Sequence, residues 1–177
     1  MMNLDWIRAA VLLTTLAVAV WQDVRGRRIA NGLVVLAASS ALLVALLHDG
    51  LAGVWLALTG GLLGLVVLLP LYAMRAMGAG DVKLMAVVGM LVGANNVFSV
   101  LLAVFVAGGV LALVVAAYHR TLERLLGNVR AMGLATVLRL ISAAPVEPDI
   151  SIRSVGQLPY AIAIATGSLA WLFWKNG

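Results

Sequence analysis

Long apolar runs, separated by short clusters of charged and turn-forming residues, make up most of the chain. Most of these runs approach the roughly 20 residues that an α-helix needs to cross a hydrocarbon core of about 30 Å. They cover Ala9–Trp21 (extendable back to Leu4), Ile29–Leu47, Leu51–Met74, a stretch from near Asp81 to the turn Gly93–Asn96, Val97–Tyr118 and Val155–Trp174. The pattern predicts an all-α integral membrane protein with about six transmembrane helices.

The connection between the fifth and sixth runs, about residues 119–154, is the longest polar segment. From Arg120 to Ile141 apolar residues recur at a helical period, and arginines occupy the opposite face. This pattern predicts an amphipathic helix on the membrane surface, with its arginines near anionic lipid headgroups; docking of a partner is an additional possible role. The chain shows no internal repeat and no second soluble domain, so we expect a single transmembrane domain over residues 1–177.

Composition limits the classes of function. Of the 177 residues, 64% are apolar and 11% are charged, whereas soluble domains contain about half and about a quarter. These proportions exclude a soluble globule, a disordered chain and a soluble nucleic-acid binder, so we expect membrane lipids and no nucleic acid as partners. The chain has no cysteine and two histidines, so we expect no metal site and no cofactor.

Basic residues predict the orientation of the spans. Ten of the twelve lie in three loops, which contain Arg25, Arg27 and Arg28; Arg75 and Lys83; and Arg120, Arg124, Arg130, Arg139 and Arg153. By the positive-inside rule these loops are cytoplasmic, and both termini are outside. One arginine precedes the first apolar run and three follow it, so we interpret this run as a span and not as a cleaved secretory signal.

The seven acidic residues are few enough to be considered one by one. Interfacial or loop positions account for five of them: Asp5, Asp49, Glu123, Glu147 and Asp149. Asp23 and Asp81 differ because each lies where a span meets a cytoplasmic loop, at the same membrane face. Taken singly, each has an open structural interpretation: Asp23 as a helix-end acid paired with a neighbouring arginine, Asp81 as the cap of the fourth span.

Taken together, Asp23 and Asp81 favour a catalytic hypothesis. Two adjacent carboxyl groups do not both ionise cheaply, so one keeps its proton. One carboxylate can then accept a proton from water while the other donates to a peptide carbonyl, as amide hydrolysis requires in the absence of a covalent intermediate or a metal. Gly78 and Gly80 precede Asp81, and such glycines permit unusual backbone conformations or close approach of another chain.

The segment Gly78–Leu84 (GAGDVKL), preceded by Asp23–Asn31 (DVRGRRIAN), resembles the type IV prepilin peptidase family of GxGD membrane aspartic proteases. The resemblance implies that Asp23 and Asp81 are the catalytic aspartates and that Gly78 and Gly80 shape the loop of the second. It also implies a prepilin or pilin-like substrate, cleaved at the cytoplasmic face of a prokaryotic inner membrane.

Two departures from the family pattern refine the resemblance. The chain has Ala30 where the family often has proline, which makes the turn after the first aspartate less rigid. It also lacks the cysteine-containing cytoplasmic domain of the bifunctional members, so the resemblance does not extend to N-methylation. The chain is similar to the short, peptidase-only branch that serves tight-adherence (Flp-type) pili, and to archaeal preflagellin peptidases.

Lys83 and Asn31 are two further candidate residues, and there are three alternative functions to the peptidase hypothesis. Lys83 either orients Asp81 or snorkels to the headgroups, and Asn31 either binds locally through its amide or starts the second span. A GxGD protease of the presenilin or signal-peptide-peptidase kind is disfavoured because Asp23 lies at a span end. A proton-coupled transporter or channel with Asp23 or Asp81 as its relay is disfavoured because the spans contain few polar residues, and a purely structural membrane subunit is a further alternative.

Overall fold

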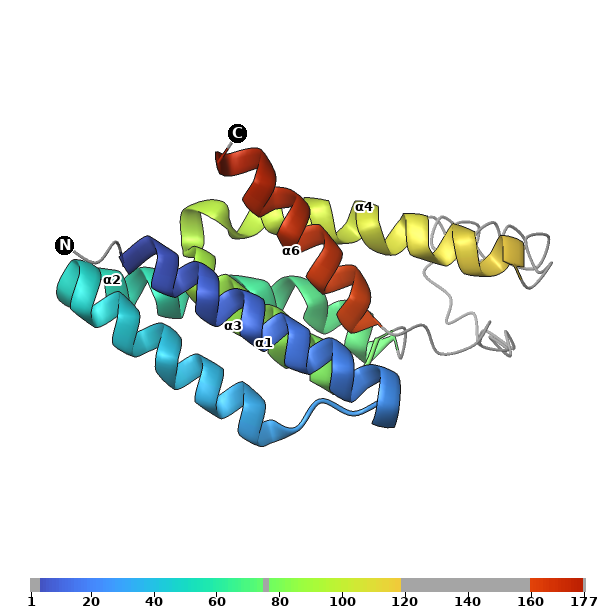
Figure 1. Ribbon diagram of the computed structural model, residues 1–177, viewed down its shortest axis with the longest axis horizontal. Helices are drawn as coiled ribbons and strands as arrows, with labels where there is room; N and C mark the ends of the chain where they lie inside the picture. Colours follow the sequence, from blue (N-terminus) through green and yellow to red (C-terminus); the bar gives the residue numbers. More distant parts are fainter. Residues whose placement is uncertain (1–3, 75–76, 119–159, 177) are drawn as a thin grey trace, which may run out of the picture. The chain divides into compact units, whose positions relative to one another are not determined.

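The computed structural model describes residues 4–74, 77–118 and 160–176 (Figure 1). Every secondary-structure element in these ranges is an α-helix: α1 Leu4–Gly26, α2 Asn31–Ala73, α3 Ala79–Val92, α4 Ala94–Tyr118 and α6 Tyr160–Asn176. The all-helical fold class is therefore confirmed. The amphipathic helix predicted from Arg120 to Ile141 lies outside the described residues.

The chain divides into two units. The first contains α1, α2, α3, α4 as far as Gly108, and α6. Of the second, residues 109–158, the structure describes the last part of α4, Gly109–Tyr118. All residues of the candidate site discussed below belong to the first unit.

Within the described ranges, three helices are long and apolar enough to cross a membrane: Asp5–Gly26, Asn31–Ala73 and Ala94–Val115. The helix α2 contains both the second and the third predicted runs. Its 43 residues correspond to a length of about 64 Å, twice the thickness of a hydrocarbon core. Gly50, with φ 60° and ψ −145°, breaks the helix into two arms, which are the cyan and green parts of α2 in Figure 1.

The second arm of α2 packs against α3 through glycines. A Cβ built on Gly60 would collide with the carbonyl oxygen of Gly89, and a Cβ built on Gly89 would collide with that of Gly60. One turn further along α2, a Cβ on Gly64 would lie 2.7 Å from the carbonyl oxygen of Met85. Small residues of this kind let helix backbones approach closely inside a membrane. The second arm and α3 therefore form one tightly packed antiparallel pair.

The helix α3 is the most enclosed element of the first unit. It contacts α1, α2 and α6, and its buried side chains include Val82, Leu84, Met85 and Val88. Gly93, with φ 78°, ends α3, and α4 begins at the next residue. The predicted turn Gly93–Asn96 is therefore shorter than expected, since three of its residues belong to α4.

Candidate active site

Asp23 lies in the last turn of α1, two residues beyond the end of the predicted apolar run. The helix dipole disfavours a negative charge at a C-terminus, so helix stability does not explain an acid in this position. The residue is 9% exposed, and its Oδ2 accepts the backbone N–H of Ala161, in the first turn of α6, at 3.4 Å. The positive end of the α6 dipole thus faces the Asp23 carboxylate.

The arginines that follow Asp23 do not neutralise it. Arg25 stacks on the Trp21 ring, 4.7 Å from its centroid, and no ion pair joins Asp23 to a basic side chain within the described residues. The structure therefore does not bear out the interpretation of Asp23 as a helix-end acid paired with a neighbouring arginine. A carboxyl group held this deep without a cation is expensive, and such groups are typical of functional sites.

Asp81 is the third residue of α3 and is 8% exposed. Its Oδ2 accepts the N–H of Gly78, the N-cap residue, at 3.2 Å. Asp81 therefore does cap its own helix, as the structural interpretation expected. Because α1 and α3 are in contact, Asp81 also lies near enough to Asp23 for a Coulombic interaction between the two carboxyl groups.

The fold thus brings the two sequence-predicted aspartates to one place. Asp23 comes from the end of α1 and Asp81 from the start of α3, and α6 contacts both helices. Two buried carboxyl groups therefore lie within Coulombic reach of each other. This is the arrangement that general acid–base hydrolysis by two carboxyl groups requires.

Gly78 and Gly80, which precede Asp81, are needed because neighbouring atoms leave no room for a side chain, and not because their backbone angles require glycine. Gly78 has φ −78° and ψ 151°, which other residues adopt readily, and Gly80 lies inside α3 without a positive φ. A Cβ on Gly78 would lie 3.1 Å from Asp81 Oδ2, and one on Gly80 would lie 3.2 Å from the Cβ of Ile29. Of the two reasons that the sequence offered for glycine here, only the lack of space applies.

Lys83 and Asn31 bind each other. The Lys83 ammonium donates to Asn31 Oδ1 at 2.9 Å, which ties the N-terminal part of α3 to the first turn of α2. Within the described residues no ion pair joins Lys83 to Asp81. Beside this link, the side-chain oxygen of Gln22 accepts the N–H of Ala30 at 2.8 Å. The two hydrogen bonds hold the α1–α2 connection next to both aspartates.

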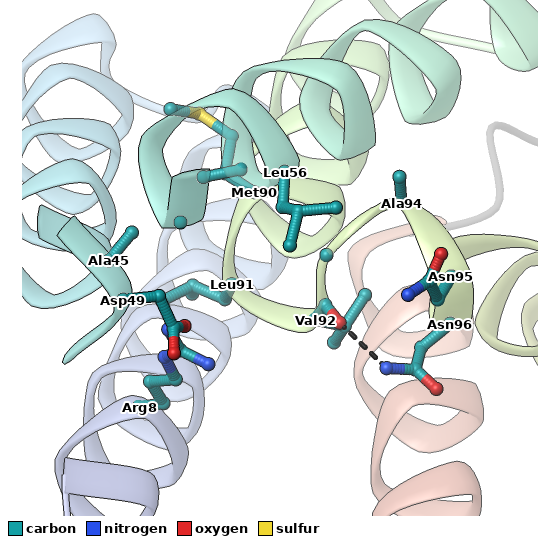
Figure 2. Close-up of a pocket in the computed structure, with 13 residues that line it drawn as sticks. Arg8, Ala45, Asp49, Leu56, Met90, Leu91, Val92, Ala94, Asn95 and Asn96 are labelled. Carbon is teal, nitrogen blue, oxygen red and sulfur yellow. Dashed lines mark hydrogen bonds and ion pairs between the residues drawn. The ribbon is translucent and has the colours of Figure 1, made fainter. Parts of the chain in front are cut away.

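A second group of charges lies at the other end of α1. Arg8 donates to Asp49 Oδ2 at 2.9 Å, and His48 Nδ1 lies 2.7 Å from Asp49 Oδ1. Figure 2 shows Arg8 and Asp49 side by side at a cavity of about 150 Å³ that Asn95 and Asn96 also line. Fifteen residues of α1 separate Arg8 from Asp23, or about 22 Å along the helix, so this cavity is not part of the aspartate site.

Sequence reasoning missed the contribution of α6. The structure places Tyr160, the first residue of α6, half-buried against the core and near Asp81. The contact between Ala161 and Asp23 joins residues 138 positions apart. The available signal was an aromatic residue at the start of the last apolar run, which by itself does not indicate a site.

The class of protein follows from these observations: apolar helices long enough to cross a bilayer, with two buried carboxyl groups at helix ends, define a helical membrane protein with a candidate hydrolytic site. The family model of the type IV leader peptidase family matches residues 10–113, more than half of the chain and including both aspartates. The chain therefore belongs to the type IV leader peptidase family, which makes it a peptidase that processes prepilin-like substrates. Neither a curated protein nor a solved structure matches the sequence.

Proposed function

We propose that this protein is an aspartic endopeptidase that removes the leader peptide of a prepilin-like protein, with Asp23 and Asp81 as its catalytic pair. The observation that carries the proposal is that two acidic side chains, 58 positions apart in the sequence, are both buried and lie within Coulombic reach of each other. Membership of a leader peptidase family supports the same chemistry.

The two carboxyl groups divide the reaction between them. The ionised carboxylate accepts a proton from a water molecule, whose oxygen forms a bond to the carbonyl carbon of the scissile peptide. The protonated carboxyl group gives its proton to the carbonyl oxygen, so the intermediate is a neutral gem-diol. When the C–N bond breaks, one carboxyl group gives its proton to the nitrogen, and a hydroxyl of the gem-diol gives its proton to the other carboxylate, so the pair is again singly protonated.

The proposal includes a topology. The two arms of α2, together with α1, α3, α4 and α6, make six membrane-crossing segments of one domain in the inner membrane of a prokaryote. The excess of arginine and lysine in the three loops supports a cytoplasmic position for the aspartate pair, with both termini outside. The basic leader of a prepilin-like substrate then meets the site at the same interface at which its apolar helix begins.

Co-expression with a candidate prepilin tests the proposal. The wild-type protein is compared with Asp23→Asn and Asp81→Asn, and loss of the leader is followed as a mobility shift. We expect either substitution alone to abolish processing while the protein still inserts into the membrane. Full processing by either variant contradicts the proposal, and loss of proton flux together with retained cleavage indicates a transporter.

A further inference from the structure

Tyr160 begins α6 at the point where this helix meets the aspartates. The neighbouring Ala161 is fully buried and donates its backbone N–H to Asp23. This hydrogen bond fixes the backbone of the first turn of α6 relative to Asp23. The Tyr160 side chain is half-buried and packs against the hydrophobic core, so its position is restricted as well.

The Tyr160 phenol also lies close to the second aspartate. Tyr160 and Asp81 are near enough for a Coulombic interaction between their side chains. Across the described part of the chain, however, the Tyr160 hydroxyl forms no hydrogen bond. A half-buried tyrosine usually directs its hydroxyl to a partner. Because the Tyr160 hydroxyl lies near two carboxyl groups proposed to act on a peptide bond, we expect its hydrogen-bond partner to be the substrate.

We propose that Tyr160 is a third catalytic side chain, whose hydroxyl donates a hydrogen bond to the carbonyl oxygen of the scissile peptide. This inference rests on the two-aspartate mechanism proposed above. As the water oxygen bonds to the carbonyl carbon, the carbonyl π electrons move onto the oxygen, and the phenol stabilises the negative charge that develops there before Asp81 or Asp23 delivers its proton. The phenol keeps its own proton throughout.

The size of the expected effect follows from other enzymes with preorganised donors. Loss of one donor to a developing oxyanion lowers kcat by about 100- to 1,000-fold. Because the hydrogen bond strengthens only as the transition state forms, its loss lowers kcat and leaves KM nearly unchanged. A tyrosine that only packs against the core affects folding or KM, and its role survives replacement by phenylalanine.

Steady-state kinetics of the purified full-length protein distinguish these cases. The substrate is a synthetic peptide with a basic leader followed by an apolar helix, in detergent micelles. For Tyr160→Phe we expect kcat to fall about 100-fold with KM within about threefold of wild type. The matched control is Tyr72→Phe, at a half-exposed tyrosine near the end of α2, for which we expect wild-type rates.

A donor-bearing replacement tests the hydroxyl itself. Incorporation of p-aminophenylalanine at position 160 keeps the ring and supplies an N–H donor, so we expect it to restore most of the kcat that phenylalanine loses. Wild-type kcat in Tyr160→Phe, or no gain from the amino group, overturns the inference. If Tyr160→Phe is fully active while Asp23→Asn and Asp81→Asn are inactive, only this inference fails. If the aspartate variants are active, the proposed function fails with it.

Discussion

The contact between Gly60 and Gly89 provides a sharp test of how the fold positions the site. Replacing Gly89 by alanine adds a Cβ that would lie 2.8 Å from the carbonyl carbon of Gly60 and closer still to its oxygen. Ordinary contacts between such atoms are about 3.5 Å, so α2 and α3 must separate by about 1 Å. A change of this size in a packed interior costs about 1–3 kcal/mol, and the better helix propensity of alanine offsets about 1 kcal/mol of it.

We therefore expect Gly89→Ala to lower the free energy of unfolding by up to about 2 kcal/mol. The matched control is Gly32→Ala in the first turn of α2, where a Cβ would meet nothing within 4 Å. There the same substitution raises stability by up to about 1 kcal/mol, because only the backbone entropy of the unfolded chain changes. Unfolding in detergent micelles, followed by circular dichroism, measures both variants.

The same displacement reaches the candidate site. Asp81 lies eight residues before Gly89, about 12 Å along α3, and a shift of about 1 Å between catalytic groups lowers rates by up to about 100-fold. We expect Gly89→Ala to insert into the membrane but to cleave slowly, and Gly32→Ala to cleave at the wild-type rate. If the two substitutions change stability and cleavage in the same direction and by the same amount, the contact between Gly60 and Gly89 does not position the site.

Two other predictions concern the hydrogen bond beside the site and its protons. A double-mutant cycle on Lys83→Met and Asn31→Ala, measured by unfolding in detergent, should give a coupling energy of about 0.5–1 kcal/mol; zero coupling means that the Lys83–Asn31 bond contributes nothing in solution. The rate of leader cleavage should pass through a maximum with pH, because the proposed catalytic pair would be inactive when both carboxyl groups are protonated at low pH and when both are ionised at high pH. A rate that rises continuously with pH indicates a different nucleophile.

Hydrophobic patterning predicted the helices better than their ends. The first apolar run stops at Trp21, but α1 continues to Gly26, because charged residues outside the hydrocarbon extend a helix as readily as apolar ones. The apolar pattern therefore predicts which residues lie in the hydrocarbon core and does not predict where the hydrogen-bonded helix ends. The gap between the predicted runs Ile29–Leu47 and Leu51–Met74 coincides with the break in α2, which depends on one glycine, Gly50, with positive φ.

The sequence contains a motif that indicates the close packing of α2 against another helix. Gly60 and Gly64 have the G-x-x-x-G spacing of close-packed membrane helices. This motif says that a helix has a close partner but does not say which one. The identity of α3 as that partner follows from the folded chain, in which Gly89 faces Gly60.

Because the chain has few acidic residues, Asp23 and Asp81 stood out in the sequence. The predicted membrane topology put both at the same membrane face. Their burial and mutual proximity depend on contacts between α1, α3 and α6, which no local pattern encodes. The position of Tyr160 was out of reach for the same reason. Sequence reasoning thus selected the two candidate carboxyl groups, whereas the fold supplies the third helix that encloses them.

We have proposed that Asp23 and Asp81 act as one catalytic unit. The most direct test measures cleavage rates for Asp23→Asn, Asp81→Asn and the double variant, with Asp49→Asn at the opposite end of α1 as control. We predict that each single variant loses at least about 1,000-fold, that the double variant loses no more than either, because groups that act as a unit are not additive, and that Asp49→Asn keeps the wild-type rate. Losses that multiply in the double variant, or cleavage retained by either single variant, contradict the claim.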